Sequence, residues 1–150
     1  MDFSIATAVR LVHLTALALA VGGATAKNLL LVRCRRDLAF VPTFLGLERL
    51  ITRQIIVGQV LITISGVAYA WLLGYGFTPR VVVKVVLVAA VWVLGPCIDT
   101  IVAPRMRQHA PGPGQSASPA FQRALSRYVF WDLAATGIYY AVIVFWVTMT

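Results

Sequence analysis

The sequence is poor in charged residues, and especially in acidic ones. Only 12% of its 150 residues are charged and only 5 of them are Asp or Glu, whereas about a quarter of the residues of a typical soluble domain are charged. This scarcity excludes an ordinary soluble enzyme. The hydrophobic content of 60% in turn excludes a disordered chain, because disordered chains are poor in apolar residues.

Motifs for most kinds of active site are also missing. The 2 cysteines and 2 histidines form no CxxC or CxxCH pair for zinc or covalently attached haem, and no HExxH, GxSxG or Walker loop is present. The net charge of +8 does not indicate a nucleic-acid partner, because the basic residues stand at the ends of apolar runs without interleaved aromatic residues. We therefore expect no nucleic acid.

The sequence does contain long apolar runs, at residues 4–32, 51–73, 81–103 and 128–148. Each is near the ~20 residues that a helix needs to cross a hydrocarbon layer of ~30 Å. Because lipid offers the backbone no hydrogen-bond partners, runs of this length without alternation predict helices. We predict an all-α fold, an integral membrane four-helix bundle that forms a single transmembrane domain over residues 1–150.

The connections differ in character. Residues 74–79 (GYGFTP) predict a tight turn, and residues 108–120 (QHAPGPGQSASPA) predict a polar loop, because Gly and Pro break helices. Residues 37–48 (DLAFVPTFLGLE) are too short to span a membrane, and we expect them to lie along its inner surface.

The basic residues predict the orientation. Three of the 13 Lys and Arg flank the outer side, and ten flank the first and third connections. The three are Arg10, Arg80 and Lys84, and the ten are Lys27, Arg33, Arg35, Arg36, Arg49, Arg53, Arg105, Arg107, Arg123 and Arg127. By the positive-inside rule, residues 33–50 and 104–127 face the cytoplasm and both termini face outside. Arg10 and Lys27 are expected to reach opposite interfaces.

His13 is the histidine that falls within a predicted span, where a polar residue is costly and calls for a reason. The positions that follow it at helical spacing are mostly small and include Ala16, Ala20, Gly23 and Ala24. Two interpretations remain open. The small residues allow close helix packing, with His13 bonded to a neighbouring helix. Alternatively, they make room for a macrocycle whose iron His13 ligates.

Lys84 lies one turn into the third run, at about the depth of His13. It is either a lysine that reaches the interface or a functional residue that binds a carboxylate or carries a proton. Arg10 stands three residues before His13 and so on nearly the same face. With Arg80, these residues form an outer basic group that suits an anionic ligand. We expect His13 and Lys84 to converge on one outer cavity, with Arg10 at its mouth.

The inner half of the bundle has its own polar set. A carboxylate near lipid depth is normally paired, so we expect Asp132 to meet Arg53 or another inner cation, with Asp99 nearby. A proton path is the alternative. Gln59 and Thr63 belong to a stripe that either packs or lines a cavity. An aromatic belt at the outer interface is expected from Trp71, Tyr75, Tyr139, Tyr140 and Trp146.

Three segments carry a resemblance to a known group: VRLVHLTALALAVGG, LITISGVAYAWLLGYG and VVVKVVLVAAVWVLG. The chain resembles bacterial four-helix membrane proteins related to the HemJ-type protoporphyrinogen oxidases and the copper-resistance D-type domains. In the HemJ-type family, an early-helix histidine and a lysine that opens a later helix form the functional pair, linked to haem b. The resemblance implies that these are His13 and Lys84. The chain departs from the family at Trp131 and Asp132, where an Asn-Glu pair is usual.

The resemblance implies a small haem b-binding or porphyrin-related redox protein of the bacterial inner membrane, in the class of haem-dependent membrane oxidoreductases. His13 would be the axial iron ligand and, with Lys84, catalytic, while Arg10, Arg80 and Lys84 would bind the cofactor. A six-coordinate haem with two histidine ligands then needs a homo-oligomer or a partner membrane subunit within the lipid bilayer. The alternative is a non-enzymatic accessory or assembly subunit of a larger membrane complex.

Overall fold

The structure is a computed structural model that describes residues 4–72, 74, 76, 78–112 and 115–148, the last three by their backbone alone. It has no strand among these residues, as the all-α prediction requires. In chain order the elements are α1 (Ile5–Arg36), η1 (Leu38–Phe40), α2 (Val41–Leu72), α3 (Pro79–Cys97), η2 (Ile98–Val102), α4 (Ala103–Gln108) and α5 (Pro119–Thr148). Among the described residues, 4 helical segments are long and apolar enough to cross a membrane, which supports a multi-pass membrane protein.

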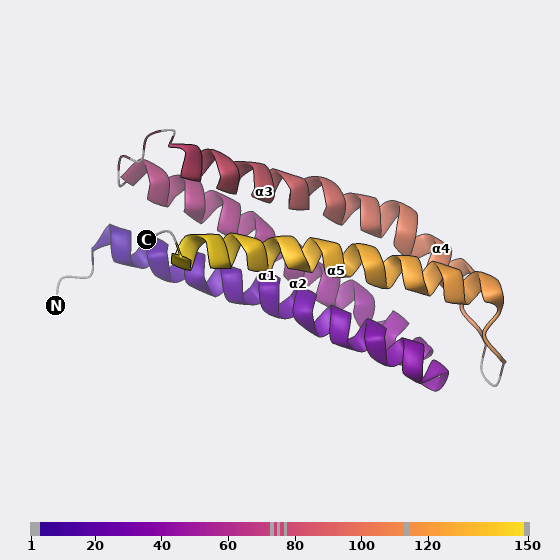
Figure 1. Ribbon diagram of the computed structural model, residues 1–150. Coiled ribbons are helices and arrows are strands. Elements are labelled where there is room, and N and C mark those ends of the chain that lie inside the picture. Colours follow the sequence, from indigo (N-terminus) through magenta and orange to yellow (C-terminus); the bar gives the residue numbers. More distant parts are fainter. Residues whose placement is uncertain (1–3, 73, 75, 77, 113–114, 149–150) are drawn as a thin grey trace.

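The four long segments run side by side, with α1 and α3 at opposite edges and α2 and α5 between them (Figure 1). The start of α1, the end of α5 and the junction of α2 with α3 lie at one end of the molecule, which we call the terminal end. The connection around η1 and the loop between α4 and α5 lie at the other end, which we call the basic end. Helix α1 packs along α2, and α5 contacts both α1 and α3, while α2 and α3 barely touch within the described part of the chain.

Small residues bring α1 and α2 together. Ala16 and Ala20 are fully buried, and a Cβ placed on Gly58 would lie only 2.6 Å from the amide nitrogen of Ala20. A Cβ on Gly23 would likewise lie 2.9 Å from the Ile55 side chain. Because lipid gives apolar helices no reason to associate, close backbone approach through small residues is a main source of contact energy. The small-residue face of α1 is therefore a packing face that α2 covers.

The helices extend further than the sequence predicted. Helix α2 begins at Val41, so most of residues 37–48 continue this helix, and the prediction of a separate surface segment was wrong. Helix α5 begins at Pro119, well before residue 128, and the Ser118 hydroxyl accepts a hydrogen bond from the Phe121 amide there at 3.1 Å. Hydropathy alone marks where a helix is apolar, whereas capping residues such as Ser118 mark where it begins.

The elements α3, η2 and α4 follow one another without a break and form one long helical segment, which we call the third rod. Its prolines do not end it. Pro96 lies inside α3 and is followed by the π-helix η2, and Pro104 lies in the first turn of α4. A proline removes one backbone donor and crowds the preceding turn, which wider π-helical winding accommodates. The rod therefore continues to Gln108, beyond the predicted end at residue 103.

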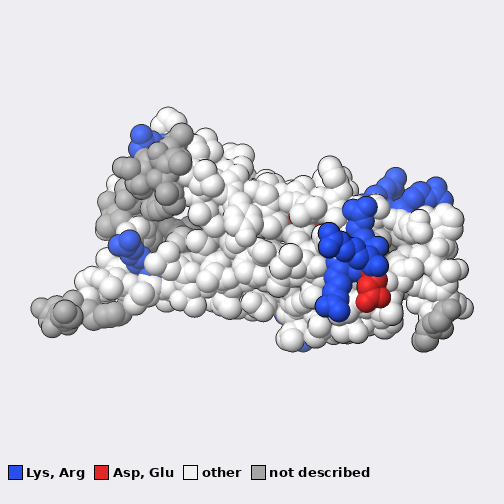
Figure 2. All heavy atoms as spheres, turned by 60° about the horizontal axis from the view of Figure 1, so that its bottom comes forward, with Lys and Arg blue, Asp and Glu red and all other residues white. Residues whose placement is uncertain are grey.

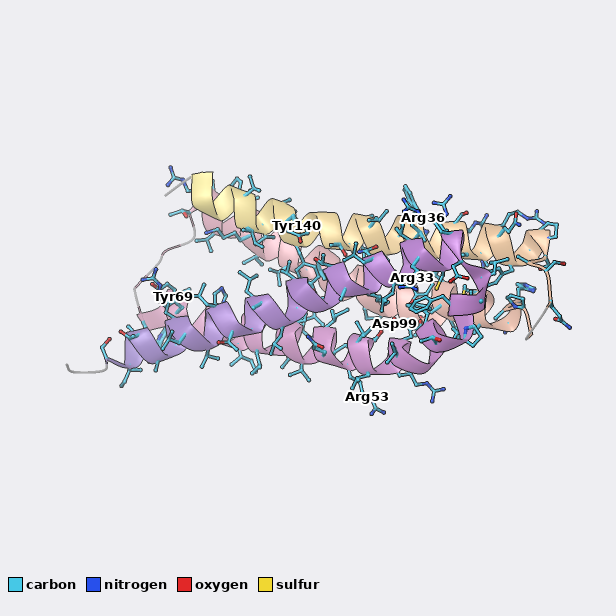
Figure 3. All side chains as sticks on the ribbon, turned by 90° about the horizontal axis from the view of Figure 1, so that it is seen from below. Arg33, Arg36, Arg53, Tyr69, Asp99 and Tyr140 are labelled. Atoms are coloured by element: carbon cyan, nitrogen blue, oxygen red, sulfur yellow. The ribbon has the colours of Figure 1, made fainter. Side chains whose placement is uncertain are left out.

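Basic side chains gather at the basic end, while the middle of the visible surface carries almost no charge (Figure 2). Figure 3 shows Arg33, Arg36 and Arg53 in this part of the molecule and Tyr69 toward the other end. Two apolar clusters hold the bundle together, one at the basic end around Phe44, Phe121 and Tyr128, and one further along around Ala20 and Ile62. A group of buried polar side chains completes the interior.

Candidate functional site

Lys27 is the centre of the buried polar group. Its residue exposure is 3%, and its Nζ lies 3.1 Å from Asp132 Oδ1 and 3.7 Å from Asp99 Oδ1. The three residues come from α1, α5 and η2, so the cluster joins three elements of the bundle. The prediction that Lys27 reaches the interface was wrong. The prediction that Asp132 pairs with an inner cation is confirmed, although the cation is Lys27 and Arg53 is exposed.

The position of Lys27 on its helix explains why it points inward. It lies on the same face as Ala20, Gly23 and Ala24, which are all buried. Side chains three or four residues apart share a helix face, so a residue that continues this stripe must also face the interior. The sequence contained this signal, because Lys27 ends the small-residue stripe that begins after His13.

The charges of this cluster do not balance. One ammonium faces two carboxylates, and Asp132 is only 6% exposed. Asp132 Oδ2 and Asn28 Oδ1 are buried and have no hydrogen-bond partner among the described residues. The Asn28 amide nitrogen donates to Thr136 Oγ1 at 2.6 Å. Buried oxygens without a donor are uncommon and costly in proteins, so these two mark a place where a proton, a water molecule or a cation is favoured.

A second polar group lies next to the first, toward the basic end. Glu48 is 1% exposed, accepts a hydrogen bond from Arg107 Nε at 2.9 Å, and accepts another from the Tyr128 hydroxyl. The Lys27 ammonium lies 5.2 Å from the centre of the Tyr128 ring, a cation–π distance. The two groups therefore form one connected set of polar side chains. It reaches the surface at Arg107, whose side chain is 38% exposed.

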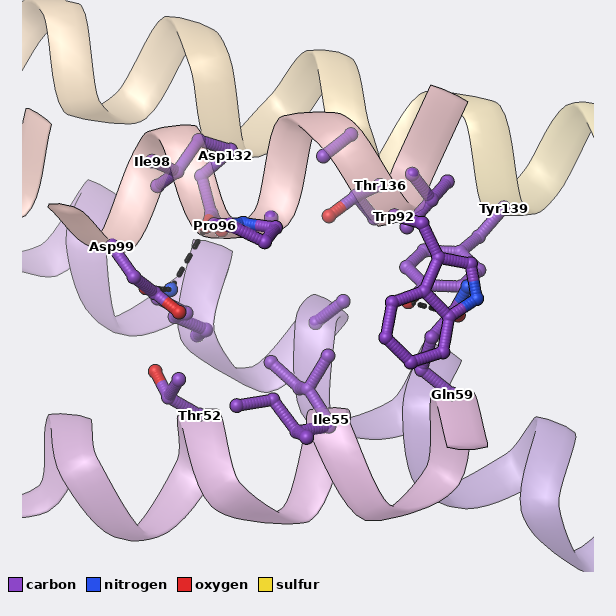
Figure 4. Close-up of a pocket in the computed structure, with 16 residues that line it drawn as sticks. Thr52, Ile55, Gln59, Trp92, Pro96, Ile98, Asp99, Asp132, Thr136 and Tyr139 are labelled. Carbon is purple, nitrogen blue, oxygen red and sulfur yellow. Dashed lines mark hydrogen bonds and ion pairs between the residues drawn. The ribbon is translucent and has the colours of Figure 1, made fainter. Parts of the chain in front are cut away.

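A cavity of about 300 Å³ opens between α2 and α3, with residues of α1 and α5 also lining it. Asp99 and Asp132 lie at one end, and Gln59, Trp92 and Tyr139 at the other (Figure 4). Its remaining lining is mainly apolar, and includes Ile55, Ile56 and Val91. The cavity is thus a largely apolar space with an acidic end.

Hydrogen bonds fix the far end of this cavity. The Tyr139 hydroxyl donates to Gln59 Oε1 at 2.7 Å, and Trp92 Nε1 donates to Thr63 Oγ1 at 3.0 Å. The alternative that Gln59 and Thr63 line a cavity is thus confirmed for Gln59, while Thr63 is not among the lining residues and bonds Trp92.

The aromatic-belt prediction was wrong for Tyr139, which is buried. Tyr140 is half exposed and bonds Thr25, and Trp71 is exposed. Tyr75 and the Trp146 side chain lie outside the described residues.

His13 is bonded to the neighbouring helix. Its Nδ1 lies 2.9 Å from the hydroxyl oxygen of Ser65, and that hydroxyl donates its own proton to backbone carbonyls, chiefly that of Leu61. A hydroxyl has one proton to give, so Ser65 must accept the hydrogen bond from His13. The imidazole then carries its proton on Nδ1 and leaves the lone pair of Nε2 available, which is the form in which histidine binds metals.

The other members of the outer basic group are less closely associated. Lys84 is half-buried and lies within electrostatic range of His13 and Arg80. Arg10 and Arg80 are exposed. Neither of the two cavities described for the structure includes any of these four residues. The structure thus brings His13 near Lys84, but does not join them to Arg10 in a described cavity.

The chemistry of His13 fits an axial ligand of haem iron, but the space beside it within the chain does not fit the macrocycle. The interpretation of His13 as a haem ligand requires space for a porphyrin beside the small residues Ala16 and Ala20. Gly58 of α2 covers both of them. A Cβ on Gly66 would lie 3.4 Å from the His13 ring, so α2 also lies close to the imidazole. Within this chain, the packing interpretation describes the α1 face.

Comparison of the chain with models of protein families, with curated proteins and with solved structures gives no match.

Proposed function

We propose that this protein carries protons through the membrane, with Asp132 as the central carrier group. The observation that carries this proposal is the environment of Asp132 Oδ2. The oxygen is buried, has no partner among the described residues, and belongs to a carboxylate that lines the cavity and shares one lysine with a second carboxylate.

The charge balance explains why this carboxyl group would exchange a proton. With both acids ionised, the cluster holds one negative charge in excess, and an uncompensated buried charge costs several kcal/mol. Taking up one proton removes that excess. Ionisable residues that face the interior of a membrane bundle are typical of proton relays, and the connection of Asp132 to both Lys27 and the cavity suits such a role.

A sequence of polar groups supports access from the basic end. Arg107 is partly exposed and contacts Glu48, which bonds Tyr128, over whose ring Lys27 lies. On the other side of the cluster, the cavity leads from Asp132 toward the Gln59–Tyr139 pair. Its volume of about 300 Å³ is enough for several water molecules, at ~30 Å³ each in the liquid.

Proton flux into liposomes tests this function. Purified protein is reconstituted with a pH-sensitive dye inside, and a potassium gradient with valinomycin drives protons inward. We expect flux above that of protein-free liposomes. The Asp132→Asn variant should lower it on the order of 100-fold, the scale of a lost acid–base group, because an amide cannot carry the proton.

The matched control is Asp37→Asn, since Asp37 is exposed at the basic end, away from the cavity. It should conduct as the unmodified protein does. Equal flux through the Asp132→Asn variant, or no flux above empty liposomes, would reject the proposal.

A second candidate function is haem binding by His13. It is favoured because Ser65 accepts the hydrogen bond from Nδ1 of His13, which leaves the Nε2 atom of His13 available to a metal. Because α2 covers the small-residue face, haem would be held between this chain and a second subunit. It would supply one-electron redox chemistry when bound. Absorption spectra of the oxidised and reduced protein test this: a Soret band lost in His13→Ala but kept in Lys84→Met supports it, and a colourless preparation rejects it.

We further propose that the basic end faces the cytoplasm of a bacterial cell and both termini face outside. The gathering of arginine at one end supports this orientation. It survives the reassignment of Lys27 to the interior, because nine of the 13 basic residues still flank that side.

A further inference from the structure

A second, differently charged depression lies at the basic end, between η2–α4 and α5. This groove has a volume of about 360 Å³, and Arg105, Arg123, Arg127 and His109 contribute its polar lining. None of the described residues that line it carries a carboxylate. The groove uses a different face of α5 from the proton site, since Asp132 lines the cavity and Trp131, next to it in sequence, lines the groove.

The arginines of the groove are not neutralised by the protein. None of the three forms an ion pair with a described carboxylate, and Arg123 Nε donates a hydrogen bond to the backbone oxygen of Pro119 at 3.3 Å. Arg107 differs, because it turns toward the interior and pairs with Glu48. Two arginines that lie two positions apart in α4 thus have different environments, and Arg105, which has no carboxylate partner among the described residues, lines the groove.

The groove is also graded in polarity along its length. The η2–α4 segment and α5 run in opposite directions (Figure 1), so His109 and Arg123 lie toward the loop, and Ile101 and Trp131 lie toward the middle of the spans. At ~1.5 Å per residue, Trp131 is about 6 Å further along α5 than Arg127. One end therefore suits a multiply hydrogen-bonding anion, and the other suits hydrocarbon.

We propose that this groove binds an anionic phospholipid. Arg105, Arg123 and Arg127 hold its phosphate, and the part of an acyl chain next to the headgroup lies against Ile101 and Trp131. The planar guanidinium group matches phosphate oxygens with paired hydrogen bonds. Basic pockets between spans at the inner leaflet bind lipid headgroups in this way. The apolar end, which includes Trp131, favours a lipid over free phosphate, which would use only the arginines. The proposal does not depend on proton transport.

Trp131 provides a local probe for the test. The protein is placed in phosphatidylcholine nanodiscs that contain a minor fraction of a brominated lipid, either phosphatidylglycerol or phosphatidylcholine. Brominated acyl chains quench tryptophan fluorescence on contact. Subtracting the quenching in a Trp131→Phe variant isolates the signal of Trp131. We expect brominated phosphatidylglycerol to quench Trp131 more strongly than brominated phosphatidylcholine at the same fraction.

Variants separate the groove from general surface charge. Replacing Arg105, Arg123 and Arg127 together by Gln should weaken the preference for phosphatidylglycerol about 100-fold, at about fivefold for each arginine near the membrane surface. The matched control replaces Arg35, Arg36 and Arg53 by Gln, which removes the same charge from exposed positions outside the groove. The control should keep the preference to within about fivefold, the effect of one such charge.

Several results would overturn the proposal. These are equal quenching by the two brominated lipids, equal loss of preference in the two triple variants, or abolition of the preference by inorganic phosphate, which would assign the groove to a soluble anion. The single variants Arg105→Gln and Arg123→Gln, with helical content checked by circular dichroism, keep the test decisive if the triple variant fails to fold. Each should lose part of the preference, and an unchanged preference in both would also overturn the assignment.

Discussion

Removal of the Lys27 ammonium is expected to destabilise the fold more than removal of any other single charge in its cluster. A Lys27→Met substitution keeps most of the side-chain length and deletes the charge. It leaves Asp132, which is 6% exposed, without its cationic partner at 3.1 Å, and deprives Asp99 of the same partner at 3.7 Å. Breaking a buried ion pair by removing one partner costs about 3–5 kcal/mol, because the other charge stays buried.

The two acids provide graded comparisons. The Asp99 side chain is 30% exposed and lies further from Lys27 Nζ, so Asp99→Asn should cost about 0–1 kcal/mol, as for a partly exposed pair. Asp132→Asn leaves Lys27 with Asp99, and should cost about 1–3 kcal/mol. The double variant Lys27→Met with Asp132→Asn removes the uncompensated charge. It should therefore be more stable than Lys27→Met alone, which is non-additive behaviour typical of residues in contact.

Thermal unfolding in detergent micelles, followed by circular dichroism, measures these differences. For domains of about 150–250 residues, 1 kcal/mol shifts Tm by about 2–4 °C. Lys27→Met should therefore lower Tm by about 6–20 °C, whereas Arg53→Met, at an exposed position of the same end, should change it little. If Lys27→Met melts within about 2 °C of the unmodified protein, the lysine is not buried between the two acids, and the reasoning from the cluster fails.

Three further predictions concern other parts of the bundle. Gly58→Ala should lower the free energy of unfolding by about 1–3 kcal/mol, because its Cβ would meet the backbone of α1 at 2.6 Å. Gly22→Ala is the control, since its Cβ would have nothing within 4 Å, and it should be neutral or stabilising in the same thermal unfolding experiments. Tyr128→Phe should cost about 1–3 kcal/mol by leaving buried Glu48 one donor short. This penalty should vanish in a Glu48→Met background, which removes the acceptor, if the hydrogen bond is its cause. A cysteine at Gln115 should resist an impermeant thiol reagent added to intact cells, and strong labelling from outside would reverse the proposed orientation.

The sequence was sufficient for the architecture, because the physics of the bilayer leaves few choices. An apolar run of about 20 residues in lipid must be a helix or part of a closed barrel, so composition and run length predicted four spanning helices. Their true ends depended on local chemistry instead. Ser118 and Thr78 cap α5 and α3 through hydrogen bonds to the amides of Phe121 and Val81, and hydropathy does not register such bonds.

The candidate site was harder to predict, because it depends on which faces meet. Asp132 was expected to find a cation, and it did, but the choice of Lys27 over Arg53 required the rotation of α1 and α2 relative to each other. That rotation is set by Gly58 against Ala16 and Ala20. The helical stripe that contains Lys27 was visible in the sequence. Because Lys27 was expected at the interface rather than in the interior, the sequence alone did not predict the cluster.

The two polar groups also explain how the loosely held third rod keeps its place. Apolar helices gain little from association in lipid, so hydrogen bonds and ion pairs supply much of the specificity between them. Asp99 binds η2 to α1 through Lys27, and Arg107 binds α4 to α2 through Glu48. Both attachments lie on the basic side of α3, while α3 itself approaches α2 closely at few positions and bonds it through Trp92 and Thr63. Attached in this way and packed on α5, the rod leaves open the space between α2 and α3 in which the cavity and the Asp132 carboxylate lie. The Lys27–Asp99 pair that binds this rod to the bundle thus also lies at the acidic end of the cavity.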